Sequence, residues 1–381
     1  MFRLTRIVFI PLLPLIERDY KYLGINYFKE RGFDVSILET HQFLLPGYKE
    51  AVNIKYAKFD NIYEPETLND LFKFINNLSE NDYIFSFGTT PEGVKLLNKM
   101  RINTNAKFVT YVSGSIPLTS APCGVLNNLK RAIAPVLRKF LFRYGIGTFE
   151  SDIYITGAPK DELVYPFLAG PKTKKIHGHG RDYEMCMTTN SYSNKPYCVF
   201  LDTDVINASD SVIFKDIFGK DEDKNIIDYQ KKLVNFFKWI EKNMSVEIII
   251  SAHPKSRIFL NKETFHGYKI VFDSSPSLVK SSEFVINEGS SAIMFAIYFN
   301  KPILFFTMKE ISFFYDFPCS FTKALNKKII PIDDLNSLKI EDIKDELNNK
   351  RKYNYYKYNY LTYENDLESV FKIIEDELIG T

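Results

Sequence analysis

The chain has 381 residues, 45% of them hydrophobic and 25% charged, which is the composition of a globular protein long enough for two domains of ordinary size. Its 49 Lys and Arg and 47 Asp and Glu leave a net charge of +2, so nothing indicates general nucleic-acid binding. The four cysteines form no CxxC pair, which argues against a disulfide scaffold or a zinc site and fits a reducing cytoplasm.

A short apolar run near the N-terminus resembles the core of a signal peptide. Two prolines and the charged residues at 17–19 instead favour a first strand at 6–10 followed by a loop. The sequence contains no apolar run of the ~18–20 residues needed to span a bilayer. We therefore expect a cytoplasmic protein.

The first half alternates short apolar runs with stretches of helical periodicity. Strands are predicted at 6–10, 34–38, 82–87, 107–112 and 152–156, and we expect the last of them to end this half. Helices are predicted at 20–31, 68–78 and 91–100. Repeated strand–helix units predict a parallel, Rossmann-like sheet, which we assign to a domain spanning 1–190.

Glu92 lies in the segment GTTPEG, which follows the strand at 82–87 and opens a helix. One interpretation is structural, because Pro91 suits the first helical position and a carboxylate in the first turn is favoured by the helix dipole. The other makes Glu92 a base that faces a cleft and activates an acceptor. The segment is not a P-loop, because the Gly-Lys-Ser/Thr ending is missing.

Residues 125–144 combine five Lys and Arg with regularly spaced apolar residues. This pattern is typical of a helix that lies on an anionic membrane surface, but a solvated helix with an ordinary core face has the same pattern. A peripheral membrane contact through this segment is therefore one of two interpretations.

His177 and His179 are two residues apart, with Asp182 and Glu184 close behind them. These residue types can bind a metal, but the sequence has no third His nearby and no HExxH pattern. We favour a polar segment that lines the cleft near a hinge, with Asp182 contacting the substrate.

The second half begins with a predicted strand at 197–201, directly followed by Asp202 and Asp204. Further strands are predicted at 246–250, 284–286, 303–306 and 328–332, because these runs are short, β-branched or aromatic, and bounded by turn residues. Helical periodicity at 293–299 completes a strand–helix–strand unit. We assign residues 196–350 to a second Rossmann-like domain and 351–381 to a helical tail.

Two polar segments follow neighbouring strands of this second domain, and ligands bind beyond the carboxyl ends of parallel strands. A glycine there allows close backbone approach, serine hydroxyls can cap a helix or donate to a phosphate, and basic residues add positive charge. Each pattern alone is common in turns and caps, but together they predict a nucleotide phosphate site. Its expected residues are His253, Pro254, Lys255, Arg257, Glu288, Gly289, Ser290 and Ser291.

A His-Pro pair and a later Ser-Ser pair, within residues 246–307, resemble bacterial glycosyltransferases of the GT-B fold. They most resemble the enzymes that use CMP-activated acidic sugars: the sialyl-, polysialyl- and Kdo transferases of capsule and lipopolysaccharide synthesis. In that group the two motifs hold the phosphate and ribose of CMP, which here implies His253, Pro254, Ser290 and Ser291. The resemblance implies an α/β fold with two Rossmann-like domains facing across a cleft, and a glycan or lipid-linked glycan acceptor.

Glycosyl transfer requires a carboxylate that acts as base or nucleophile, and positive groups at the leaving phosphate. Asp202 is the first candidate for the carboxylate, with an Asx turn as its structural alternative; Glu92 and Asp182 follow. We expect no cofactor and no metal, although Asp202-Thr203-Asp204 has the spelling of a DxD metal motif.

Two other functions remain open. The first is a nucleotide-sugar epimerase similar to the UDP-N-acetylglucosamine 2-epimerases, although NEGSSA lacks their paired-glutamate helix start. The second is a non-catalytic partner in glycan assembly that retained the fold. In GT-B proteins the last helix often crosses back to the first domain, and the Tyr-rich run at 353–363 could be that crossover or an exposed surface.

Overall fold

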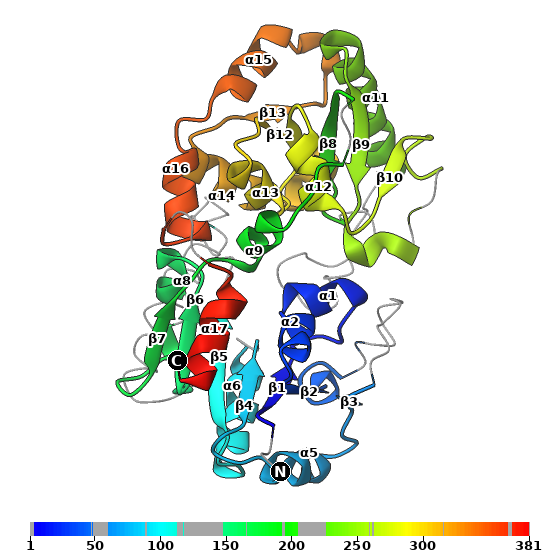
Figure 1. Cartoon of the computed structure of the whole chain (residues 1–381). Helices are drawn as coiled ribbons and strands as arrows, with labels where there is room; N and C mark the ends of the chain where they lie inside the picture. Colours follow the sequence, from blue (N-terminus) through cyan, green and yellow to red (C-terminus); the bar gives the residue numbers. More distant parts are fainter. Residues whose placement is uncertain are drawn as a thin grey trace, which may run out of the picture.

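The computed structural model describes residues 4–46, 48, 60–87, 90–112, 117, 148–164, 166–192, 195–204, 226–258, 260, 263–314, 316–364 and 368–380. Two parallel sheets, each with its own helices, form the two halves of the molecule (Figure 1). The segment 125–144 lies outside the described residues, so its predicted membrane contact stays a prediction.

The first sheet has seven strands in the order β3-β2-β1-β4-β5-β6-β7. Its strands are β1 Arg6–Ile10, β2 Asp34–Leu38, β3 Ile62–Tyr63, β4 Tyr83–Ser86, β5 Lys107–Val112, β6 Ile153–Thr156 and β7 Lys174–His177. Its helices are α1 Glu17–Tyr22, α2 Ile25–Glu30, α3 His41–Leu44, α5 Leu68–Asn76, α6 Pro91–Ile102 and α8 Pro159–Val164. The strand at 152–156 was predicted to be the last strand of this half, and this was wrong, because β7 follows it and pairs with β6 at the sheet edge.

The second sheet has six strands in the order β10-β9-β8-β11-β12-β13. They are β8 Tyr197–Leu201, β9 Glu247–Ser251, β10 Lys269–Val271, β11 Val285–Asn287, β12 Ile303–Thr307 and β13 Ile329–Pro331. The helices are α11 Ile226–Met244, α12 Ser275–Ser281, α13 Ile293–Tyr298, α14 Asp316–Leu325 and α15 Ile340–Asn348. In both sheets the strand order reverses beside the first strand, next to β4 in one and β11 in the other, which is the Rossmann arrangement.

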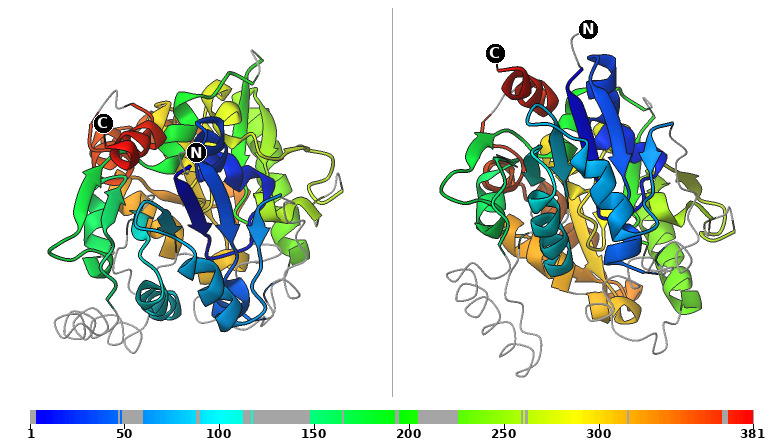
Figure 2. Two further views of the ribbon diagram at one scale, coloured as in Figure 1. Left: turned by 60° about the horizontal axis from the view of Figure 1, so that its bottom comes forward. Right: turned by 90° about the horizontal axis from the view of Figure 1, so that it is seen from below.

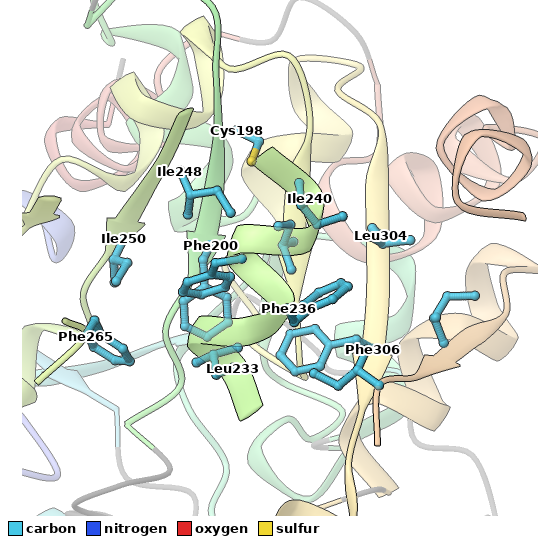
Figure 3. Close-up of a cluster of buried hydrophobic side chains, with 14 of the residues drawn as sticks. Cys198, Phe200, Leu233, Phe236, Ile240, Ile248, Ile250, Phe265, Leu304 and Phe306 are labelled. Carbon is cyan, nitrogen blue, oxygen red and sulfur yellow. The ribbon is translucent and has the colours of Figure 1, made fainter. Parts of the chain in front are cut away.

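Central strands of both sheets are buried on both faces, as their unbroken apolar runs predict. In β8, Cys198 and Phe200 point into one core cluster, whereas Tyr197, Val199 and Leu201 point into another. Figure 3 shows the first of these clusters, in which aromatic side chains of α11 pack on the sheet. The ring centroids of Phe236 and Phe306 are 5.5 Å apart.

The chain crosses back to the first half near its C-terminus. Helix α16, Tyr353–Tyr356, packs in the core of the second half, whereas α17, Val370–Ile379, packs in the core of the first. Both views of Figure 2 show α17 next to elements of the first sheet. Helix α9, Arg181–Met187, joins the two halves in the forward direction and contacts α1, α12 and α13.

Candidate active site

A pocket with a cavity volume of about 170 Å³ opens between the two halves at the carboxyl ends of β8 and β9. Loops after β8 and β11 meet here, where the strand order of the second sheet reverses. Crevices at such points are the usual ligand sites of doubly wound sheets. The pocket is lined by Arg18, Tyr22, Asp182, Leu201, Asp202, Ser251, Ala252, His253, Pro254, Ser275, Ser290, Ser291, Ala292 and Phe295.

Asp202 is 5% exposed and lines this pocket, with both carboxylate oxygens accepting hydrogen bonds. Oδ1 accepts from the backbone N–H of Asp204 at 3.1 Å, which is an Asx turn, and Oδ2 accepts from the backbone N–H of His253 at 3.0 Å. Burial raises the pKa of Asp202 to about 6, aided by the nearby charge of Asp204 and opposed by these hydrogen bonds. Asp202 therefore fixes the loop after β9 against the end of β8.

His253 lines the pocket and follows β9 by two residues. Its ring Nδ1 accepts a hydrogen bond from the backbone N–H of Lys255 at 3.3 Å. Because Nδ1 is the acceptor, the proton of the neutral imidazole resides on Nε2. The loop geometry thus selects the tautomer in which Nε2–H is a donor.

The turn after β11 is held by Asn287, whose Oδ1 accepts from the backbone N–H groups of Gly289 at 2.9 Å and Ser290 at 2.7 Å. Gly289 has φ of +139°, a conformation that side chains disfavour. Ser290 and Ser291 line the pocket, but helix α13 begins two residues later, at Ile293. Neither serine is its N-cap, which is Ala292.

Glu288 is fully buried behind this turn and does not line the pocket. Its carboxyl group accepts hydrogen bonds from Thr203 Oγ1 at 2.5 Å and from Tyr229 OH at 2.8 Å. Burial raises the pKa of Glu288 to about 8, and the charge of Asp202 adds to this effect. Through these hydrogen bonds Glu288 connects the turn after β11 to the loop after β8 and to helix α11.

Lys255 and Arg257 do not line the pocket, contrary to the role expected for them. Both lie on the short helical turn Pro254–Ile258. The guanidinium of Arg257 pairs with Asp273 and stands 4.7 Å from the ring centre of Phe272, on an exposed face. The pocket therefore lacks these two predicted cations.

Asp182 reaches the same pocket from α9, whereas Glu92 does not. Burial raises the pKa of Asp182, and the charges of Arg18 and Arg181 and a hydrogen bond from Tyr22 oppose this rise. Glu92 is exposed in the first turn of α6, whose N-cap Thr90 accepts from the Gly93 N–H at 3.1 Å. Its position matches the structural interpretation.

His177 and His179 do not converge with Asp182 on a common centre. His177 stacks on Tyr363 with ring centroids 4.2 Å apart. His179 is fully buried, and its Nε2 lies 3.3 Å from Glu184 and 3.1 Å from the carbonyl oxygen of Glu368. The described part of the chain holds no group of three or more His, Cys, Asp and Glu side chains placed to bind a metal.

Four of the pocket residues that the sequence analysis missed have polar side chains: Arg18, Tyr22, Ser251 and Ser275. Ser251 ends β9 and its hydroxyl donates to Ser275 at 2.7 Å. The position of Ser251, directly before the recognised His-Pro pair, was a signal that could have been used. Arg18 and Tyr22 come from α1 in the other half, and no local pattern of the sequence links them to this site.

No protein-family model matches the sequence, and a comparison with curated proteins finds no match. A solved structure from Listeria monocytogenes, assigned as a UDP-N-acetylglucosamine 2-epimerase, superposes with a TM-score of 0.50 at 14% identity, over 100% of this chain and 98% of that one. The UDP-GlcNAc 2-epimerase of Methanocaldococcus jannaschii gives 0.49 at 12% identity, over 99% and 100%. A spinosyn rhamnosyltransferase complexed with thymidine diphosphate gives 0.41 at 12%, over 90% of each chain.

At these identities the likeness shows the fold alone. With the two parallel sheets it confirms the predicted class, an α/β protein with two Rossmann-like domains of the GT-B type. Among the helices of the described residues, none combines the length and the apolar character needed to cross a membrane.

Proposed function

We propose that the protein is a glycosyltransferase that moves a sugar from a nucleotide-activated donor to a bacterial surface glycan or its lipid-linked precursor. The observation that supports this best is the pocket at the switch point of the second sheet, where His253, Ser290 and Ser291 converge. The opposite wall, formed by α1 and α9, brings a carboxyl group within the same pocket. We assign the wall of the second half to the donor and the opposite wall to the acceptor.

A donor with a single phosphate fits the charges of this pocket. Among its described lining residues the cationic groups are Arg18 and, when protonated, His253, against the carboxyl groups of Asp182 and Asp202. At the phosphate itself, the phosphodiester of a CMP-sugar brings one negative charge and the diphosphate of a UDP-sugar brings two, and each buried charge requires compensation. The carboxylate of an acidic sugar is a further charge, which lies on the sugar and not at the phosphate. We therefore propose a CMP-linked sugar, whose acidic character rests on the resemblance of the His-Pro and Ser-Ser motifs.

In the proposed mechanism the second half binds the leaving group. The Nε2–H of His253 and the hydroxyls of Ser290 and Ser291 donate to phosphate oxygens, so that charge developing on the leaving CMP is stabilised. Asp182 accepts the proton of the acceptor hydroxyl, because its raised pKa makes it a stronger base than an ordinary carboxylate. Asp202 positions His253 through the backbone and does not itself react.

The test is incubation of the purified protein with CMP- and UDP-sugars, with the products followed by NMR. We expect slow release of CMP from a CMP-sugar, and no such release by the His253→Ala variant. Isomerisation of the sugar on UDP would instead identify an epimerase. Tight nucleotide binding without turnover of any donor would identify a non-catalytic partner in glycan assembly.

A further inference from the structure

The described residues of the second half supply hydrogen-bond donors to the pocket but no permanent positive charge. Its lining residues carry serine hydroxyls, an imidazole and the carboxyl group of Asp202, whereas Lys255 and Arg257 lie outside the pocket. Within the described residues the only permanent cation of the lining is Arg18, which belongs to the first half. Among the described residues, the permanent countercharge for an anion in this pocket comes from across the cleft.

Arg18 is held loosely enough to accept such a ligand. Its side chain is 39% exposed, and its Nη2 lies 3.6 Å from Asp19 Oδ1, beyond hydrogen-bonding range. The guanidinium stands 5.3 Å from the ring centre of Tyr22, another pocket residue. It makes no hydrogen bond to any of the residues that the structure describes, and the carboxylates that act on it are those of Asp19 and Asp182. Its five N–H donors are therefore not committed to a described partner.

Arg181, the neighbouring arginine, is used differently. Its guanidinium lies over the rings of Tyr22, Phe87 and Tyr111, at 4.8, 5.4 and 5.6 Å from their centres, and it does not line the pocket. The two arginines thus divide their roles, one packed on aromatic rings and the other turned to the pocket.

We propose that Arg18 binds the phosphate of the nucleotide donor from the first half, opposite the hydroxyls of Ser290 and Ser291. This inference rests on the proposed function and adds that the donor is held between both halves. A planar guanidinium suits this role because it can bind two phosphate oxygens at once. Arg18 then decides between a nucleotide and its parent nucleoside.

The experiment compares CMP with cytidine, and UMP with uridine, by calorimetric titration of the full chain. The wild-type protein should prefer the monophosphate. Arg18→Ala should lower the affinity for the monophosphate about ten- to a hundredfold, which is the range for one hydrogen-bonded charge, and leave the nucleoside within about twofold. The affinity of Arg18→Lys for the monophosphate should lie between the affinities of the wild type and of Arg18→Ala. Lys21→Ala is the matched control, since it removes an exposed charge from the same helix and should leave the preference unchanged.

Each other outcome contradicts the proposal. Equal weakening of CMP and cytidine by Arg18→Ala would show that Arg18 merely supports Tyr22 and Asp182. Loss of the preference in Lys255→Ala, with Arg18→Ala unaffected, would place the countercharge on the second half. If the wild-type protein binds none of the four probes, the proposed function fails together with this inference.

Discussion

At the scale of single residues, the second half contains two buried carboxyl groups whose pKa values are raised. Glu288 and Asp202 are both buried and stand close enough for the charge of one to raise the pKa of the other. Their pKa values lie near 8 and 6, so each binds its proton more tightly in the folded than in the unfolded chain. Such groups favour the folded state at low pH and lose that contribution as pH rises.

The first prediction concerns this pH dependence. Asp202 is half ionised at pH 6 and largely ionised by pH 7, so we expect Glu288 to contribute most of the change between pH 6 and 8, where the folded chain retains a proton that the unfolded chain has lost. The free energy of unfolding should therefore fall across this window, with Glu288 alone contributing at most roughly 1.4 kcal/mol per pH unit. Urea unfolding at pH 6, 7 and 8 measures it.

Glu288→Gln is the control for that measurement. An amide remains neutral at all these pH values and still accepts a hydrogen bond from Thr203 or Tyr229, so its stability curve should be flatter than that of the wild type. Parallel curves for the two proteins would show that other groups cause the pH dependence.

Residues that follow a strand were predictable from the sequence, because strand ends in a parallel sheet share one edge. His253, Ser290 and Asp202 were expected at one site and line one pocket. They meet because β8 lies between β9 and β11, an order that the sequence alone does not state. The position of the Arg257 side chain outside the pocket was not predictable, because its guanidinium pairs at the surface with Asp273, sixteen residues away.

At the scale of elements, the apolar runs of the sequence located the buried strands but did not reveal the exposed edge strand β7. Strands β1, β5 and β8 begin and end where predicted, since both of their faces are covered. Strand β7 was missed because its sequence, KKIH, is mostly exposed and carries no apolar signal. The predicted helix at 20–31 is two helices, because the chain turns at Gly24, which has φ of +77°.

Gly24 leads to a prediction on the docking of α17. A Cβ at this position would lie 2.6 Å from the ring of Phe371, which belongs to α17 and is buried against the first half. Gly24→Ala should destabilise the protein by about 2–4 kcal/mol, from the left-handed backbone and the overpacked ring together. Chemical denaturation measures the change.

Gly32→Ala is the matched control, because Gly32 also has positive φ, +86°, but nothing lies within 4 Å of its Cβ position. It should cost only the backbone part, about 1–2 kcal/mol. When Phe371 is also replaced by Ala, Gly24→Ala should lower the free energy of unfolding by about as little as Gly32→Ala does. If the two glycine variants are equally destabilised in the wild-type background, the contact with Phe371 is not what Gly24 accommodates.

On the scale of the whole molecule, the first half is built from both ends of the chain. Helix α17 contributes Val370, Phe371, Ile374 and Leu378 to the core of the first half, each 9% exposed or less. The start of α17 is hydrogen-bonded to α9, because Glu184 of α9 accepts from Ser369 Oγ at 2.8 Å and from the Val370 N–H at 2.9 Å. Helix α17 is therefore structurally part of the first half, whereas α16, earlier in the same tail, belongs to the second.

The last prediction follows from this arrangement. A chain that ends at residue 367 lacks α17 and exposes the apolar surface beneath it, and burying one such side chain contributes about 1.5–3 kcal/mol. The first half should lose stability and the second should not, because α16 remains in place against the core of the second half. Hydrogen exchange followed by mass spectrometry separates the two: protection should fall in β1 and β4 and persist in β8 and β9. Equal loss of protection in both sheets would show that the two halves unfold as one unit, and loss confined to the second sheet would contradict the assignment of α17.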